Sequence, residues 1–143
     1  MIVDVNVIVV ATVEVIVSAL TTQLSRALVD ALDMLSFQKL DVYKASIEFL
    51  ALALEIIRHL PRGHADLADQ LRRSAQSTPQ NIAEGAGRAS RPDKAKHYTI
   101  ARAEAMESAC HLDVMKVQDI IEAGRYARGM ALLERMVSML TKM

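Results

Sequence analysis

Apolar residues recur every three or four positions from residue 41 onward, which is the spacing of helices that bury one side. Asp41 is a suitable cap for the first helix, over 41–60, and Pro61 with Gly63 ends it. This segment carries two neighbouring stripes, Tyr43, Ile47, Leu50, Leu54 and Ile57, and Phe49, Ala53, Ile56 and Leu60. An apolar face this wide is more than one neighbouring helix covers.

The second segment, 65–84, has one stripe and an internal proline. Its apolar positions are Leu67, Leu71, Ala75, Thr78 and Ile82. Pro79 has no N–H and its ring clashes with the carbonyl four residues back. We therefore expect a kink or break near residues 74–78.

Two more helices are expected over 92–122 and from 125 to the end. Ser90 can cap the first of them, and Pro92 suits its first turn. Its stripe is mostly small and so allows a close neighbour: Tyr98, Ala101, Ala105, Ala109 and Leu112. The last helix again has two stripes, Tyr126, Met130, Leu133, Val137 and Leu140, and Leu132, Met136, Met139 and Met143.

The short connections between these four segments imply antiparallel neighbours. We predict an all-α, up-down-up-down antiparallel four-helix bundle over residues 34–143. Only 5 Gly and 3 Pro argue against a many-stranded β domain, and 52% apolar residues exclude a disordered chain. A single Cys excludes a disulfide framework and a Cys-based zinc finger.

Residues 1–33 form an atypical Val-rich extension, with eight of the 13 Val in the first 17 residues. Because Val is β-branched, residues 1–20 favour a strand, and residues 20–35 allow a short helix. A membrane span is an alternative that Asp4, Asn6 and Glu14 oppose, and a secretory signal lacks its basic start. We expect no membrane contact, a cytoplasmic protein, and an extension that is poorly packed or precedes a true start at Met34.

The most distinctive motif runs from residue 70 to residue 88. Its pieces are Arg72-Arg73-Ser74-Ala75, Ser77-Thr78-Pro79, Asn81-Ile82-Ala83-Glu84-Gly85 and Gly87-Arg88. Together with segments 37–45 and 98–102, it resembles the bacterial four-helix-bundle proteins encoded by intervening sequences in 23S rRNA genes. The resemblance covers residues 36–143, with Ala103-Glu104 where that family often has Gly-Ser.

The resemblance implies a ring-shaped homopentamer without established activity. It also implies a relation to the accessory variability protein of diversity-generating retroelements, which binds nucleic acid and partners a reverse transcriptase. For this chain it suggests self-association, with RNA or DNA and a reverse transcriptase as further partners. Within the motif, we expect structural roles for Ser77, Pro79, Asn81, Glu84 and Gly85. Asn81 and Glu84 would satisfy backbone groups freed by Pro79 or bond a neighbouring subunit.

Charge bears on nucleic-acid binding. The chain has 17 bases and 17 acids, but residues 34–143 carry a net +3 and residues 58–102 a net +5. Candidate phosphate contacts are Arg72, Arg73, Arg88, Arg91, Lys94 and Lys96. A solvated face with local ion pairs is the alternative to that basic band. We expect at most weak, salt-sensitive binding without sequence preference, since few aromatic residues are present for base stacking.

Enzymatic and metal sites are not supported by the sequence. Glu104, Glu107 and His111 share a helical face, but a bundle metal centre wants a Glu-x-x-His pair and Cys110 stands where that His would be. We expect these three residues to face solvent and Cys110 to be buried. No catalytic residue, metal or cofactor is predicted. The sequence favours a non-enzymatic oligomeric scaffold or accessory binding protein, or a purely structural homo-oligomer without nucleic-acid affinity.

Overall fold

The computed structural model describes residues 5–33 and 35–143. The chain divides into two units, Met1–Leu35 and Ser36–Met143, each with its own internal contacts. The expectations that concern Asp4 and Met34 lie outside the described residues.

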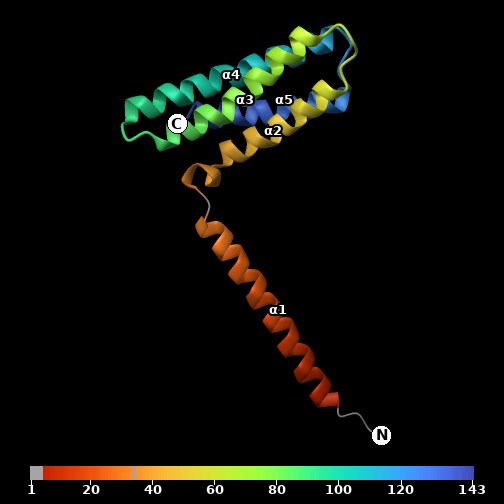
Figure 1. The fold of residues 1–143 in the computed structure, drawn as a ribbon, viewed down its shortest axis with the longest axis vertical. Coiled ribbons are helices and arrows are strands. Elements are labelled where there is room, and N and C mark those ends of the chain that lie inside the picture. The colour runs from red at the N-terminus through yellow and green to blue at the C-terminus, as the bar shows by residue number, and fades with distance from the viewer. Residues whose placement is uncertain (1–4, 34) are drawn as a thin grey trace. The chain divides into compact units, whose positions relative to one another are not determined.

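The second unit is a four-helix bundle preceded by a short 3-10 helix, η1 (Ser36–Lys39) (Figure 1). Its helices are α2 (Asp41–Arg58), α3 (Ala65–Gly87), α4 (Arg91–Val117) and α5 (Ala123–Leu140). Each packs against the two that adjoin it in the cyclic order α2, α3, α4, α5, and successive helices run in opposite directions. The predicted all-α, up-down-up-down bundle is confirmed.

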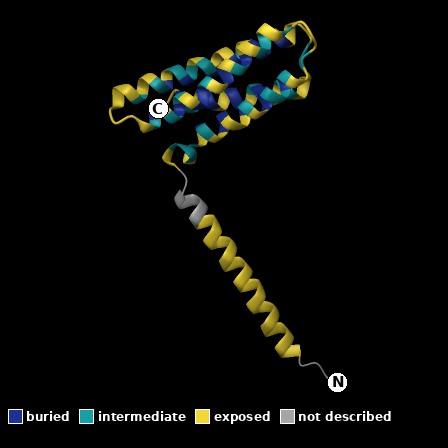
Figure 2. Cartoon of the chain, in the orientation of Figure 1, coloured by how far each residue is buried: buried dark blue, intermediate teal, exposed yellow. Residues whose placement is uncertain are grey.

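One of the two stripes on α2 forms the core, and the other stays at the rim (Figure 2). Phe49, Ala53 and Ile56 are buried, whereas Ile47 of the first stripe is 42% exposed. On α3, the expected positions Leu71, Ala75, Thr78 and Ile82 are all buried, as predicted. The rim stripe of α2 is therefore apolar surface that this bundle covers only in part.

The small residues of α4 allow α3 to approach closely, as expected. Ala101 and Ala105 are fully buried, and Ser108 of α4 meets Ser74 of α3 with 2.8 Å between the two Oγ atoms. Ser74 Oγ also donates to the carbonyl of Leu71. The two hydroxyls thus satisfy one another in a seam that is closed to solvent.

The structure corrects the cap expected for α2 and the break expected in α3, whereas the kink expected there stays a prediction. Asp41 does not cap α2, because the N-cap is Leu40, without a side-chain cap bond, and Asp41 begins the helix. It lies 3.7 Å from Lys44 Nζ and adds negative charge to the first turn, where the helix dipole favours it. The α3 helix is not broken near Ser74–Thr78 but continues through Pro79 to Gly87.

The end of α4 also differs from expectation, since the helix stops at Val117 rather than at Glu122. Asp119 takes a left-handed backbone conformation with φ of 55°, and Ile120 N–H donates to the Met115 carbonyl five residues back. Glu122 instead caps α5, accepting from the N–H groups of Gly124 at 2.7 Å and Arg125 at 3.0 Å. The predicted Ser90 cap of α4 is confirmed by its bond from Asp93 N–H.

The capping bonds predict how acid affects α5. The backbone N–H groups of Gly124 and then Arg125 hold the pKa of Glu122 below its ordinary value of 4.5. A carboxyl with a lowered pKa in the fold stabilises it above that ordinary value, and the contribution disappears as the pH falls through the folded pKa. We expect Glu122→Gln to lower the melting temperature at neutral pH and to flatten its decline below pH 4.5. Melting curves of Glu134→Gln, on the same helix but outside the cap, should keep the parental slope.

The first unit contains α1 (Val5–Asp33), so the strand expected over residues 1–20 was wrong for the described residues. An unpaired strand leaves its backbone N–H and C=O groups without partners, whereas a helix bonds them internally. The preference of Val against helices is only a few tenths of a kcal/mol per residue, roughly, and does not outweigh this. Within the described residues, α1 is the one helix long and apolar enough to cross a membrane.

Candidate functional site

The motif at residues 70–88 lies on α3 and presents two different sides of that helix. Successive residues turn by about 100°. As a result, Asn81, Glu84 and Gly85 lie toward α4, whereas Pro79 lies toward α2. The motif thus contributes to two neighbouring seams of the bundle.

Toward α4, the motif forms a polar cluster with a residue that was not predicted from the sequence. His97 of α4 places Nδ1 at 3.4 Å from Asn81 Oδ1 and Nε2 at 3.6 Å from Glu84 Oε1. Glu84 also pairs with Arg88. The His97 side chain is only 14% exposed, whereas Glu84 and Arg88 are about half exposed. The pairing was not visible in the sequence because residues 81 and 97 meet only across the α3–α4 turn.

Gly85 sets the approach of the two helices beside this cluster. A Cβ at position 85 would stand 2.8 Å from Tyr98 Cε1 and 3.1 Å from His97 Cβ. Burial raises the pKa of Tyr98 above its ordinary value of 10.0. This contact supports the structural role expected for Gly85, which stays a prediction.

Asn81 bonds the backbone of its own helix, but not at the group that Pro79 frees. Its amide donates to the Ser77 carbonyl at 2.9 Å and to the Ser77 hydroxyl at 3.1 Å. The carbonyl that lacks its helical donor because of Pro79 is that of Ala75, four residues earlier, so Asn81 does not replace the missing bond. Asn81 instead connects the α3 backbone to His97.

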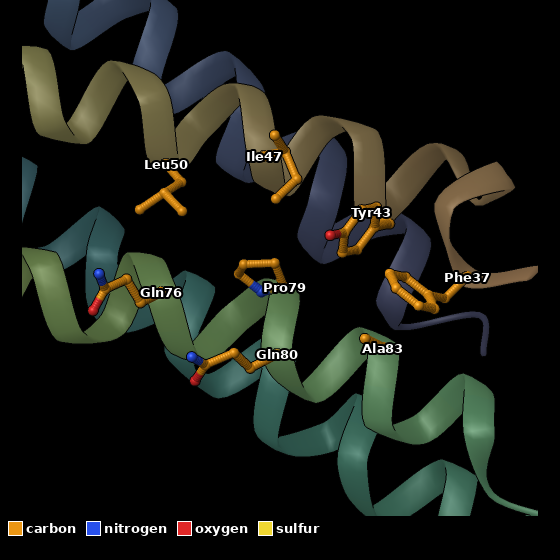
Figure 3. Close-up of a pocket in the computed structure, with 8 residues that line it drawn as sticks. All are labelled: Phe37, Tyr43, Ile47, Leu50, Gln76, Pro79, Gln80 and Ala83. Atoms are coloured by element: carbon orange, nitrogen blue, oxygen red, sulfur yellow. The ribbon is translucent and has the colours of Figure 1, made fainter. Parts of the chain in front are cut away.

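Toward α2, the motif forms one wall of an open groove of about 390 Å³ (Figure 3). Pro79 is buried in that wall, and its ring faces Ile47 and Tyr43 across the groove. The whole lining is Phe37, Tyr43, Ile47 and Leu50 from η1 and α2, with Gln76, Pro79, Gln80 and Ala83 from α3. Phe37 and Tyr43 stack edge to face, with ring centroids 4.8 Å apart, at one end. The groove therefore has an apolar floor and a polar edge.

The candidate phosphate contacts differ in their ion pairing, and the band that they were expected to form stays a prediction. Arg72 pairs with Asp69, and Arg88 pairs with Glu84. Arg73 lies 15 residues before Arg88, which is about 22 Å along α3. Arg91, Lys94 and Lys96 occupy the first two turns of α4, and no ion pair joins them to another residue in the described chain. Half of the six predicted cations are thus concentrated at one helix start.

The residues weighed for a metal centre are not gathered into one. Among the described residues, no group of three or more metal-ligating side chains comes together. His111 is buried, contrary to expectation, with Nε2 at 3.4 Å from Glu107 Oε1. Cys110 is exposed rather than buried, because the buried side of α4 runs through Ser108 and Leu112. Ala103, at the departure from the family pattern, is also exposed, so no close packing is lost there.

Comparison with known proteins gives the family. A family model described as 23S rRNA-intervening sequence protein matches residues 38–142. The chain belongs to the 23S rRNA-intervening sequence protein family. The match begins after α1, so the family assignment concerns the bundle. The relation to retroelement proteins stays a prediction.

The crystal structure of a protein with unknown function from the S23 ribosomal protein family of Bacteroides thetaiotaomicron is similar in fold. The two chains are 23% identical, and the similarity covers 71% of this chain and 95% of that one, with a TM-score of 0.66. No curated protein matches this member of the 23S rRNA-intervening sequence protein family.

Proposed function

We propose that this protein is a non-enzymatic scaffold that assembles from copies of itself through the α2–α3 seam. The observation that carries the proposal is the rim stripe of α2, which continues into the groove over Pro79. Ile47 in the middle of that stripe is 42% exposed, while Tyr43, Leu50, Leu54 and Ile57 are half-buried. Apolar residues spaced alternately by four and three positions form a seam against which a further helix packs.

The opposite side of the bundle offers a surface that a second copy can present. Tyr126, Met130 and Val137 of α5 are half-buried apolar residues. In the cyclic order of the helices, the α4–α5 seam lies across the bundle from the α2–α3 seam. Contact between two different surfaces of successive copies is head-to-tail, and it closes into a ring when the rotation permits. This supports the homopentameric ring that the family resemblance implies.

Substitution in the seam tests the assembly. A lysine at position 47 would place a charge in a contact that excludes water, so Ile47→Lys should yield monomers at micromolar concentration. Val114→Lys is the matched control, because Val114 is 37% exposed and lies on α4, outside the apolar stripes of α2 and α5. Sedimentation should give the parental assembly for Val114→Lys, and circular dichroism should give unchanged helicity for both variants. Equal assembly of the two variants, or a monomeric parent, would refute the seam.

A second candidate function is non-specific nucleic-acid binding at the start of α4. Arg91, Lys94 and Lys96 have no ion pair within the described residues, and they adjoin the positive end of the helix dipole. Repeated around a ring, these groups would form several phosphate-binding points. The alternative is a purely structural homo-oligomer, in which these cations only interact with water.

A binding assay at low salt distinguishes non-specific nucleic-acid binding from a purely structural homo-oligomer. We expect labelled RNA or DNA to shift weakly at low salt, without sequence preference, and the triple variant Arg91→Ala/Lys94→Ala/Lys96→Ala to lose the shift. The control Lys44→Ala/Arg125→Ala/Arg128→Ala removes equal charge from residues that pair with Asp41, Glu55 and Glu48. Loss of binding in both variants to the same extent would exclude a localised site, and no shift for the parent would leave the structural homo-oligomer.

A further inference from the structure

The α1 helix is apolar over most of its circumference and has no cover within the described chain. Every residue from Val5 to Leu28 is exposed, including Val5 at 70%, Val15 at 69% and Leu24 at 65% (Figure 2). The mean hydropathy of this stretch is 2.0. A helix with apolar residues on every side is the kind found inside a large core or across a membrane, rather than on an aqueous surface.

The length of this stretch matches a bilayer. Its 24 residues rise by 1.5 Å each, which gives about 36 Å. The hydrocarbon core of a typical bilayer is about 30 Å thick. The apolar part of α1 is thus long enough to span it with a modest tilt.

The three threonine hydroxyl groups in α1 do not need water as a partner. Thr12 donates to the Ile8 carbonyl at 2.7 Å, Thr21 to Val17 at 2.7 Å and Thr22 to Ser18 at 2.9 Å. Each bond lies within one turn of the helix and survives transfer into lipid. These polar side chains therefore oppose insertion less than their composition suggests.

The structure also bears on the polar residues that opposed a membrane span. Asn6 is the second residue of α1, and Asp4 lies outside the described residues. Arg26 stands near the other end of the apolar stretch, where its long side chain can reach the interface. Glu14 is then the single ionisable residue between Val5 and Ser25. Against it stand seven Val, two Ile and three Leu in residues 5–28.

We propose that α1 spans a lipid bilayer and tethers the bundle to the membrane. Because apolar residues take up most of its circumference, α1 fits a spanning orientation better than one lying in the interface. The proposal concerns residues outside the family match and does not depend on self-assembly or nucleic-acid binding.

Vesicle flotation with a depth-matched pair of variants tests the proposal. The full chain, purified in mild detergent, is reconstituted with neutral phosphatidylcholine vesicles and floated at high salt and at alkaline pH. Ile16→Lys places a charge mid-span, and Leu28→Lys places the same charge at the end. Ile16 is 52% exposed and Leu28 61%, so neither change removes packing within the described chain.

We expect the parent and Leu28→Lys to float with the vesicles. Ile16→Lys should reduce the ratio of bound to free protein on the order of a hundredfold, because the penalty for a cation is greatest at mid-span. Equal loss in both variants would mean that α1 lies in the interface, which contradicts spanning. A parent that remains at the bottom of the gradient, alone or as a water-soluble assembly through α1, would also overturn the proposal.

Discussion

Replacing Phe49 with Ala is expected to lower the free energy of unfolding of the bundle by about 3–5 kcal/mol. The ring is 1% exposed and belongs to the core cluster, near Leu52 and Gly129. Removing it leaves a cavity between α2 and α5 that neighbouring side chains fill only in part. Urea unfolding followed by circular dichroism measures the loss.

Ile47→Ala is the matched control for this change, since it lies on the same helix but on the rim stripe. Its side chain is 42% exposed, so we expect a loss of about 1 kcal/mol or less for the isolated bundle. If copies assemble through the seam, Ile47→Ala should also weaken the dependence of stability on protein concentration. Equal losses at positions 47 and 49 would show that the two stripes are not divided between rim and core.

Gly85→Ala is expected to destabilise the bundle by about 1–3 kcal/mol, although Ala is the better helix former. A methyl group there would stand 2.8 Å from Tyr98 Cε1 and 3.0 Å from Cδ1, and the ring is only 8% exposed. The ring and α4 would have to move together, which would displace His97 from Asn81 and Glu84. Thermal unfolding and the NMR shifts of the His97 ring report the two effects.

Gly87→Ala provides the comparison two residues later. A Cβ at position 87 meets no atom within 4 Å, so only the gain in helix propensity remains. We expect this variant to be stabilised by up to about 1 kcal/mol and to keep the parental His97 shifts. A Gly85→Ala variant as stable as Gly87→Ala would disprove the close approach of α3 and α4 at this point.

Much of the bundle was predictable because its signals are local. Apolar residues every three or four positions define the four helices, and Ser90 before Pro92 marks the start of α4. The predicted end of α4 was wrong for a specific reason. The sequence placed the turn at Gly124, but Asp119 takes the left-handed conformation and Glu122 accepts the first N–H groups of α5.

The candidate site was predictable only in its α3 half. Asn81, Glu84 and Gly85 were identified from the motif, whereas His97 and the Ile47 wall of the groove were not linked to it. Both residues lie outside the motif in the sequence, and helix packing brings them next to it. No local sequence pattern encodes that packing. The basic residues are a further example, because the sequence did not show that Arg72 and Arg88 form ion pairs with Asp69 and Glu84.

Periodicity and capping act within a few residues, so they were sufficient to predict the helical class and the number of bundle helices, and the motif was sufficient to predict the family. The packed fold was needed to assign which stripe of α2 is core, which cations stay unpaired and how close α3 comes to α4. The structure also has the helix α1 in place of the strand expected at the N-terminus, since the backbone must satisfy its own hydrogen bonds where no second strand of the described chain pairs with it. The burial and the ion pairing of a residue depend on its neighbours in space, and the tertiary fold decides which residues these are.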